Sequence, residues 1–387
     1  MDKFSFKIKA VDKKTGARLG VIHTAHGDIQ TPAFVPVGTQ ATVKSVSNED
    51  LGNIGTQIFF VNTYHLYLRP GLEIIKKFNG LHNFIGWNKP IITDSAGFQI
   101  FSLGDVNRTR RLRLRSEILE TALVRINDAG VFFRSHLDGS EHLFTPEKSI
   151  EAQRILGSDL TIAFDECTYY PATHDYANLA MGRTHRWALR CLATAQSKTS
   201  KEQALYGVIQ GGVFKDLRQA SVKYIASLPF EGIAIGGVSV GESKEEMKDV
   251  LGWVTPLLPE EKPRHLLGVG EIDDIFTLIE RGIDSFDCVM PSRLARMGNL
   301  LVKNMTIDIM KGQYAEDKNP IDKECECFVC KNYHRAYLNH LFKTHELLAY
   351  RLATFHNLFF MENLTKEIRN SIKKGSFLEL KTKWLAK

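Results

Sequence analysis

Short apolar runs recur along the first three quarters of the chain, and polar or small residues bound each of them. Eight such runs stand at 32–37, 57–62, 90–94, 159–165, 204–210, 232–238, 265–270 and 285–290. Near-continuous apolar strands of this length are typical of a parallel sheet that is covered on both faces. The pattern therefore predicts a buried parallel sheet.

Segments with helical periodicity lie between most of these runs, at 48–54, 71–79, 146–156, 175–197, 217–228, 244–257 and 272–282. Eight strands that alternate with helices predict an α/β protein with a (β/α)8 TIM barrel, and a doubly wound open sheet is the alternative. The segment from Val131 to His142 differs, because apolar residues flank an Asp138-Gly139 pair. We interpret it as an antiparallel hairpin inserted after the third strand.

The pattern changes after residue 300, where three cysteines fall within six residues at Cys325, Cys327 and Cys330. Three thiolates on one turn supply three of the four ligands of a tetrahedral zinc ion. Candidates for the fourth ligand are His334, His340, His345 and His356. We therefore predict a barrel domain over 1–300, and a zinc-binding subdomain with closing helices over 301–387. A site with four protein ligands would be structural, since no position is left open for water.

Composition and charge narrow the class of protein. The 387 residues are 43% hydrophobic and 24% charged, as in an ordinary soluble globular protein. No apolar run approaches the roughly 18 residues of a membrane span, and the N-terminus lacks the apolar core of a signal peptide, so a cytoplasmic location is expected.

The net charge of +6 is compatible with a nucleic-acid partner. Five arginines stand within residues 108–115, and this segment is either a surface loop that touches RNA or a solvated loop.

Polar or glycine residues follow the predicted strands at Asp94, Asp165, Gln210, Gly236-Gly237, 268–270 and Asp287. In a barrel these strand ends form one face, which carries the active site. Asp287 lies inside an apolar run, where an ionised carboxylate is costly unless it is paired or used. It is either a reactive group or a structural aspartate that holds a loop.

The same residues describe a pocket for a purine-like base. Asp94 could act as a general base, and Phe98 could stack on a planar ligand. Asp165 can accept hydrogen bonds from a guanine-like N1–H and its exocyclic amine. Gln210 and the N–H groups of Gly236-Gly237 could meet a ring nitrogen and a carbonyl oxygen. Each residue alone has a structural reading, such as a helix cap or a core side chain.

The sequence resembles the bacterial type of the tRNA-guanine transglycosylase family nearly from end to end. The motifs that carry the resemblance are Asn62–Leu66, Asp94–Gln99, Arg134–Gly139, Phe164–Cys167, Gly236-Gly237, Phe286–Cys288 and the cluster 325–330. The resemblance implies a (β/α)8 barrel with a zinc subdomain. It also implies exchange of guanine at the anticodon wobble position for 7-aminomethyl-7-deazaguanine in queuosine biosynthesis. The tRNAs would be those for aspartate, asparagine, histidine and tyrosine.

The resemblance also implies roles for individual residues. Asp287 matches the nucleophile that forms a covalent aspartyl-ribose intermediate, and Asp94 matches the residue that handles protons on the base. The residues that match the base-binding set are Asp165, Gln210, Gly237, Phe98, Leu267 and Cys167. Arg293 and Arg296 match residues near the uridines that flank the guanosine. His356 matches the fourth zinc ligand beside the three cysteines, one structural Zn2+ per subunit, and the family's enzymes act as homodimers.

Two departures from the family pattern are Ala96 and Ala295, where the family usually has glycine. Both are expected in tight active-site turns, where a methyl group could narrow the pocket. The alternatives to the implied function are the same exchange with queuine as the incoming base, and a non-catalytic tRNA-binding paralogue. A zinc amidohydrolase is disfavoured, because no His-x-His motif stands at the first strand.

Overall fold

Eight strands form the central sheet of this computed structural model, which describes residues 4–102, 124–197 and 202–386. The strands are β4 Ala33–Pro36, β5 Phe59–Val61, β6 Ile91–Thr93, β10 Leu160–Ile162, β11 Ala204–Ile209, β12 Gly232–Ile235, β13 Arg264–Leu266 and β14 Ser285–Cys288. Each lies in one of the predicted apolar runs or overlaps it. Their order in the sheet is β4-β14-β13-β12-β11-β10-β6-β5.

This strand order decides between the two predicted architectures. From β5 to β14 each strand lies beside the next one in the chain, and β4 lies on the other side of β14. The pairs β6–β10, β10–β11, β11–β12, β12–β13 and β14–β4 are parallel. A doubly wound sheet would reverse its order at a switch point. The fold is therefore an α/β nearly closed eight-stranded parallel barrel, and the open sheet is wrong.

Helices follow most of these strands, and local sequence signals set where they begin. The predicted segments correspond to α1 Asn48–Ile54, α3 Leu72–Lys77, α6 Pro146–Leu156, α7 His174–Gln196, α8 Lys215–Ala226, α9 Lys244–Val254 and α10 Ile272–Glu280. Ser47 and Ser243 begin α1 and α9 with a capping box, in which hydroxyl and carboxylate each accept a backbone N–H. Thr145 caps α6, whose first residue is Pro146, a position where the missing N–H has no cost.

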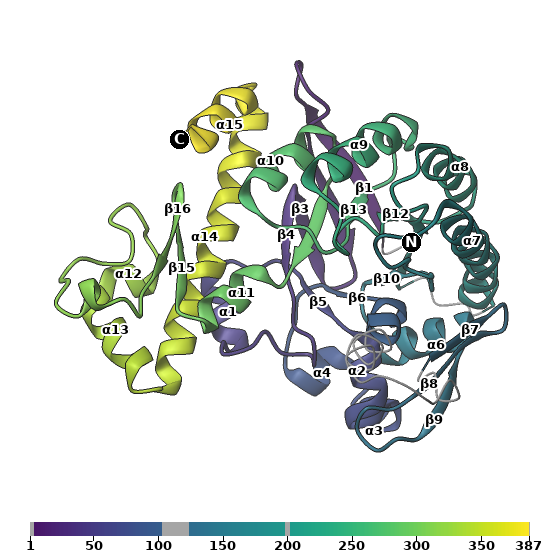
Figure 1. The fold of residues 1–387 in the computed structure, drawn as a ribbon, viewed down its shortest axis with the longest axis horizontal. Helices are drawn as coiled ribbons and strands as arrows, with labels where there is room; N and C mark the ends of the chain where they lie inside the picture. The colour runs from purple at the N-terminus through teal and green to yellow at the C-terminus, as the bar shows by residue number, and fades with distance from the viewer. Residues whose placement is uncertain (1–3, 103–123, 198–201, 387) are drawn as a thin grey trace, which may run out of the picture. The chain divides into compact units, whose positions relative to one another are not determined.

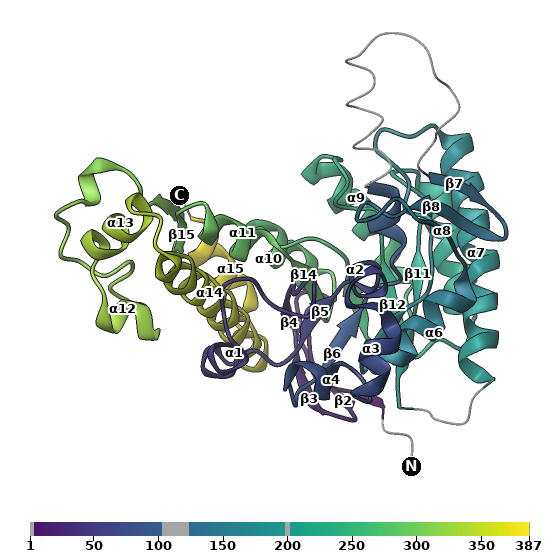
Figure 2. The ribbon, with the colours of Figure 1, turned by 90° about the horizontal axis from the view of Figure 1, so that it is seen from below.

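The chain divides into two compact units, and the first comprises residues 1–6, 23–27 and 60–267. It holds β5, β6 and β10 to β13, and helices α6, α7 and α8 run along the outside of β10 and β11 (Figures 1 and 2). All residues of β11 and β12 are buried. An antiparallel sheet of β7 Val124–Asn127, β8 Gly130–Arg134 and β9 Glu141–Phe144 follows β6 in the chain. The predicted hairpin is β8–β9, whereas β7 was not predicted.

The second unit comprises residues 7–22, 28–59 and 268–387. It holds β4 and β14, the helices α11 Met290–Arg296, α12 Phe328–Asn332, α13 Arg335–Lys343, α14 Leu347–Lys374 and α15 Phe377–Leu385, and the hairpin of β15 Asn299–Val302 and β16 Met305–Asp308. Figure 1 shows α12, α13 and this hairpin beside the long helix α14, in the region where the sequence predicts closing helices.

Several short elements have no counterpart in the sequence prediction. They are the three-stranded sheet of β1 Ser5–Val11, β2 Arg18–Thr24 and β3 Gly27–Thr31, the helices α2 Thr63–Leu66 and α4 Leu81–Ile85, and the turns η1 Tyr67–Gly71 and η3 Gly312–Tyr314. The turn η2 Thr255–Leu257 directly follows α9 and forms the end of the predicted helical segment 244–257. The arginine-rich segment 108–115 lies outside the described residues. Among the helices that are described, none combines the length and apolarity needed to cross a membrane.

Candidate active site

Polar groups gather at the carboxyl ends of four neighbouring strands in the first unit. Asp94 directly follows β6, Gln210 directly follows β11, and Gly236 directly follows β12. Asp165 stands three residues after β10. Because β6, β10, β11 and β12 are neighbours and parallel, these residues share one edge of the barrel. The prediction that strand ends collect polar residues holds within this unit.

Asp165 and Gln210 form a buried carboxylate–amide pair. The Gln210 Nε2 donates to Asp165 Oδ2 at 2.7 Å, and the Ser95 hydroxyl donates to Asp165 Oδ1 at 3.1 Å. Burial raises the pKa of Asp165 to about 6, against the lowering effect of these two donors. Gln210 Oε1 is buried and has no hydrogen-bond partner among the described residues. A buried amide oxygen without a donor is costly, which points to a ligand that completes the pair.

Asp94 is held by three N–H donors. The Asn62 Nδ2 donates at 2.6 Å and the Thr63 N–H at 2.7 Å, one to each carboxylate oxygen, while the Ala96 N–H donates at 3.2 Å. Burial nevertheless raises the pKa of Asp94 to about 6, and the hydrogen bonds oppose that rise. A carboxyl group with a pKa close to neutral can take up and release a proton in the same cycle.

The turn after Asp94 brings two segments of the first unit close together. A Cβ atom on Gly97 would lie 2.6 Å from the Asp165 carbonyl oxygen, so only glycine fits there. Ala96 has φ +71°, in the left-handed region, so this alanine does lie in a tight turn as expected. Phe98 is 48% exposed, and its ring is available to stack on a planar ligand.

Gly237 and Leu267 stand on the next loops along the same edge. Gly237 has φ +63°, and a Cβ there would lie 2.6 Å from Gln210 Oε1, so the absence of a side chain lets this loop approach the amide. Leu267 is half-buried, and its N–H donates to the Ile235 carbonyl oxygen at 3.1 Å. The structure thus places all the predicted base-binding residues in one unit.

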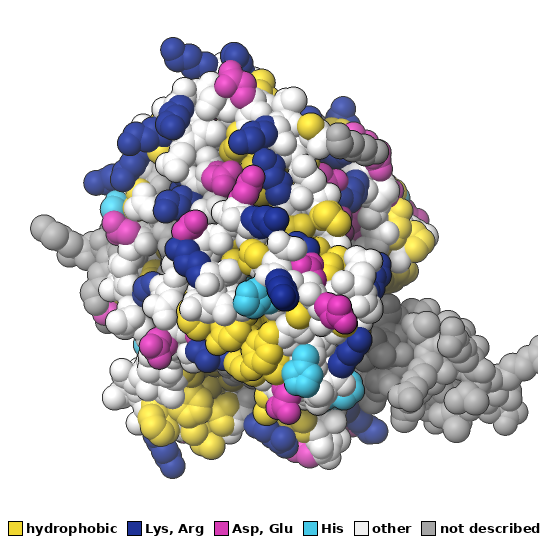
Figure 3. Space-filling view, turned by 90° about the vertical axis from the view of Figure 1, so that its left-hand side faces the viewer, with side chains coloured by type: hydrophobic (Ala, Val, Ile, Leu, Met, Phe, Trp, Pro, Cys, Tyr) yellow, Lys and Arg dark blue, Asp and Glu magenta, His cyan; other side chains and the backbone are white. Residues whose placement is uncertain are grey.

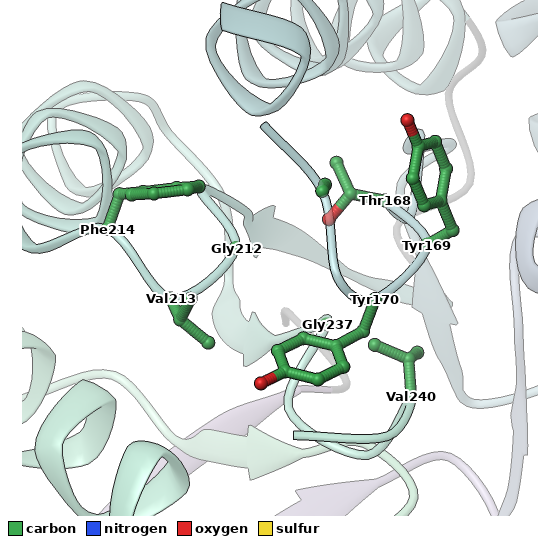
Figure 4. Close-up of a pocket in the computed structure, with 9 residues that line it drawn as sticks. Thr168, Tyr169, Tyr170, Gly212, Val213, Phe214, Gly237 and Val240 are labelled. Atoms are coloured by element: carbon green, nitrogen blue, oxygen red, sulfur yellow. The ribbon is translucent and has the colours of Figure 1, made fainter. Parts of the chain in front are cut away.

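A hollow opens beside Gly237, and Figure 4 shows its lining. The ring of Tyr170 lies between the segments that carry Val213 and Val240, whereas the ring of Tyr169 points away. The Tyr170 hydroxyl donates to Glu246 at 3.0 Å, which fixes the ring. Cys167 directly precedes this lining, and burial raises the pKa of its thiol to about 12, so the thiol stays neutral.

Asp287 belongs to the second unit, in a strand whose four residues are all buried. It pairs with Val35 of β4, and the Gly268 N–H donates to its Oδ1 at 3.0 Å. Helix α11 follows directly and carries Arg293, which is exposed, and Arg296, whose Nε donates to the Ser292 carbonyl oxygen. The backbone of Asp287 is thus fixed by the sheet, one of its carboxylate oxygens accepts a backbone N–H, and Asp287 is 8% exposed.

The expectation of a tight turn at Ala295 was wrong. Ala295 lies inside helix α11, is fully buried, and is not among the residues with positive φ. Alanine is the best helix former, so its methyl group stabilises this position relative to glycine. The turn that the sequence suggested comes three residues later, at Gly298, which has φ +78°.

The cysteine cluster of the second unit includes one histidine. The Nδ1 of His356 lies 3.8, 3.5 and 3.4 Å from the sulfurs of Cys325, Cys327 and Cys330. Its Nε2 donates to the Leu301 carbonyl oxygen at 2.7 Å, which leaves Nδ1 free to ligate. The other histidine candidates are not in this group, whose four ligand atoms could hold a metal ion. Three thiols and an imidazole are a donor set that fits zinc.

Two other groups of potential ligands suit a metal ion less well. His26 and His82 flank Asp159, but their rings stack 3.5 Å apart at 12°, and a metal must lie in the plane of each ring that binds it. The third group, Glu271, Asp273 and Asp274, is a set of neighbouring acidic residues at the start of α10. Neither group adds to the site.

Comparison with known proteins gives the family. A model described as queuine tRNA-ribosyltransferase matches residues 12–387. The chain belongs to this family. The queuine tRNA-ribosyltransferase of Pelotomaculum thermopropionicum is 48% identical over 99% of this chain and 98% of the relative. Those of Halothermothrix orenii and Shouchella clausii are also 48% identical, covering 99% and 95% of this chain and 97% and 92% of the relatives. The resemblance seen in the motifs is confirmed.

Two kinds of residue in this ribosyltransferase were missed by sequence reasoning. Asn62 and Thr63 stand in one of the motifs, but their hydrogen bonds to Asp94 were not foreseen, because the two residues lie where α2 begins after β5, about thirty positions before Asp94. Arg218 stands on the inward face of α8 between buried residues such as Leu217 and Val222. The signal that could have identified Arg218 is a charged residue within the apolar face of a predicted helix.

Proposed function

We propose that the chain is a tRNA-guanine transglycosylase that exchanges guanine at the anticodon wobble position for 7-aminomethyl-7-deazaguanine. Family membership supports a ribosyltransferase that acts on tRNA. The observation that carries the proposal is the buried Asp165–Gln210 pair with its unpartnered amide oxygen. A guanine-like base offers both the N–H donors that Asp165 accepts and polar groups for Gln210.

The proposed reaction has two displacements at the ribose. An oxygen of Asp287 attacks C1′, the bond from C1′ to the base nitrogen breaks, and the base takes the electron pair and a proton from Asp94. An ester then joins Asp287 to C1′. The incoming base gives a proton to Asp94, attacks C1′ and releases the Asp287 carboxylate. The pKa of Asp94, raised to about 6 by burial, suits both steps.

The remaining predicted residues would hold the substrates. We propose that Phe98 and Leu267 sandwich the base, that Gly237 donates its N–H to it, and that Cys167 lies near its 7-substituent. Arg293 and Arg296, on one short helix, would meet the RNA backbone beside the guanosine. The domain boundary at residue 300 remains a prediction.

We also propose one structural zinc ion per chain at Cys325, Cys327, Cys330 and His356, and a homodimer that works in the cytoplasm. When bound, the ion would join the loop 325–330 to α14, and no chemical step needs it. Phe328 and Tyr337 are 48% and 40% exposed, and the rings of Tyr333 and Tyr337 stack 5.6 Å apart. Figure 3 faces the side on which α12 and α13 of the second unit lie, and it shows hydrophobic side chains beside histidines. Such an apolar group supports contact with a second copy.

The test is incorporation of radiolabelled guanine into an anticodon stem-loop RNA that carries uridine-guanosine-uridine. Wild type should incorporate label and form a covalent RNA adduct, and Asp287→Asn should lose both by about a thousandfold or more. Asp50→Asn is the matched control, because Asp50 is also a buried aspartate of the second unit but pairs with Arg351. This control should lose stability and keep exchange.

The outcomes separate the alternatives. RNA binding without label or adduct would favour the non-catalytic tRNA-binding paralogue. Where exchange occurs, competition between 7-aminomethyl-7-deazaguanine and queuine identifies the incoming base. A wild-type enzyme that prefers queuine would overturn the choice of base and leave the reaction class in place.

A further inference from the structure

Arg218 is a fully buried arginine close to the base pocket. It is among the largest side chains with no exposed surface, and it stands on the inward face of helix α8. Burial lowers the pKa of its guanidinium to about 10, so the group remains charged at neutral pH. Among the described residues no carboxylate forms an ion pair with it. Glu242 acts on the guanidinium without forming an ion pair with it, and a buried charge that lacks such a pair is expensive unless hydrogen bonds compensate it.

The compensation comes from backbone carbonyl groups of two loops. Nε donates to Gly212 O at 2.6 Å, and Nη1 donates to Ile209 O at 3.2 Å; both oxygens lie at the carboxyl end of β11. Nη1 also donates to Gly236 O at 2.8 Å, and Nη2 donates to Gly237 O at 2.7 Å, in the loop after β12. The planar fork of one guanidinium therefore joins the two strand-end loops.

These contacts determine where the N–H groups of the second loop point. In a trans peptide the C=O and the following N–H point in opposite directions. Because the carbonyl groups of Gly236 and Gly237 both point at Arg218, the N–H groups of Gly237 and Val238 point away from it. Neither N–H donates to any group in the described part of the chain. Two adjacent N–H donors are thus held in place without an acceptor.

We propose that Arg218 is a positioning residue that presents the N–H groups of Gly237 and Val238 to a carbonyl oxygen of the bound base. This inference rests on the proposed function, since it takes a purine-like base as the ligand. Preorganised donors bind a base better than donors that must first be ordered, because the ordering cost is already met by the fold. Arg218 itself does not touch the base, so its removal should weaken base affinity through the loop.

The experiment compares Arg218→Lys with Arg264→Lys. Arg264 is also a buried arginine of the first unit that donates to carbonyl oxygens, those of Leu258 and Pro259, but it lies at the amino end of β13. Lysine keeps the charge but cannot reach both loops with a planar fork. Arg218→Lys should raise KM for guanine by about tenfold or more, the effect of one lost hydrogen bond, with a smaller change in KM for RNA.

A second readout does not depend on catalysis. Hydrogen–deuterium exchange of the free protein over residues 236–242 should be faster in Arg218→Lys than in wild type and unchanged in Arg264→Lys. Guanidinium ions added to Arg218→Ala should lower KM for guanine again, which a merely structural loss would not show. If neither Arg218 variant folds, protection of the Gly237 and Val238 amides by guanine in wild type tests whether these two N–H groups meet the base; the Gly236 N–H already donates to the Ile209 carbonyl oxygen and serves as the internal reference.

The possible results distinguish the two proposals. A folded Arg218→Lys with wild-type KM for guanine and wild-type amide exchange would overturn the role of Arg218 and leave the transglycosylase proposal standing. Absence of guanine protection at the Gly237 and Val238 amides would overturn it as well. A wild-type enzyme that exchanges no guanine would overturn the proposed function, and faster amide exchange in the variant would then still establish that Arg218 holds the loop.

Discussion

Asp94 and Asp165 show what burial does to a single carboxyl group at the candidate site. Both are almost completely buried, both accept hydrogen bonds, and burial still raises the pKa of each to about 6. Neither is paired with a cation among the salt bridges of the described residues. A purely structural aspartate in this protein, Asp50, pairs with Arg351 and has a lowered pKa instead. The raised pKa values therefore mark carboxyl groups whose burial lowers the free energy of unfolding, which is typical of functional residues.

Replacing Asp165 with asparagine should stabilise the protein and weaken base binding. Because the folded pKa of about 6 exceeds the ordinary value of 3.8, the native state binds more protons, and stability falls as pH rises through this range. The asparagine side chain would not titrate. The free energy of unfolding at pH 8 should rise by up to about 3 kcal/mol, and by about half of that at pH 5. Urea unfolding at both pH values measures this.

The matched control for that substitution is Asp50→Asn. It should destabilise the protein at pH 8, since Asp50 has a lowered pKa and its stabilisation is present above the ordinary value of 3.8. A gain in stability for Asp165→Asn that is equal at pH 5 and pH 8 would contradict the electrostatic explanation.

At the scale of elements, helix α14 holds the start of α11 and the hairpin after it through one side chain. Asn357 is fully buried. Its Oδ1 accepts from the Leu301 N–H at 2.9 Å, and its Nδ2 donates to the carbonyl oxygens of Pro291 and Asn299, each at 3.0 Å. The neighbouring residue His356 is the metal-ligand candidate. One turn of α14 thus fixes both the arginine-bearing helix and the cysteine cluster.

Asn357→Leu should lower the free energy of unfolding by about 3 kcal/mol or more, because three buried backbone groups lose their partners. Asn363→Leu in the same helix is the control, since the Asn363 side chain is exposed and, within the described residues, donates to the carboxylate of Glu367; it should change stability by less than about 0.5 kcal/mol. Chemical denaturation of the two variants measures the difference. Equal stabilities would show that Asn357 does not hold these elements together.

At the scale of the whole molecule, the second unit depends on a cluster whose ligands are far apart in sequence. Cys325, Cys327 and Cys330 lie on one loop with the short helix α12, and His356 comes from α14. Hydrogen bonds among the three sulfurs lower the pKa of Cys327 and raise the pKa of Cys330, so the cluster holds a thiolate beside a thiol that must lose its proton when metal binds. Folding and metal binding should therefore be coupled.

Removal of the metal by a chelator should lower the thermal midpoint by at least about 5 °C, and added zinc should restore it. Cys330→Ser should lose the metal, measured by elemental analysis of the purified protein. Cys191→Ser should retain it, because Cys191 is buried in the first unit away from the cluster. A metal-free protein with an unchanged midpoint would contradict the coupling.

Sequence reasoning found the barrel strands because parallel strands covered on both faces are nearly all apolar. It failed for β1, whose residues are all exposed or half-buried and which therefore has no such signal. It also failed for β2 and β3, where polar residues interrupt the buried apolar ones. It also placed Ala295 in a turn, although φ is positive at Gly298 and not at Ala295. Which residue after α11 has a positive φ depends on how the β15–β16 hairpin folds back, and this is not evident from the local sequence.

For the site, the sequence alone identified the residue types: carboxylates and an amide at strand ends, an exposed aromatic, and three thiols at ligand spacing. Local chemistry suffices for these, because each follows from a motif of a few residues. The tertiary structure decided which groups meet. It put His356 with the cysteines, Gln210 on Asp165, and Arg218 on the carbonyl groups of two loops. Such contacts join residues that are distant along the chain, and only the packing of helices, loops and strands in three dimensions, which no local pattern records, brings them together.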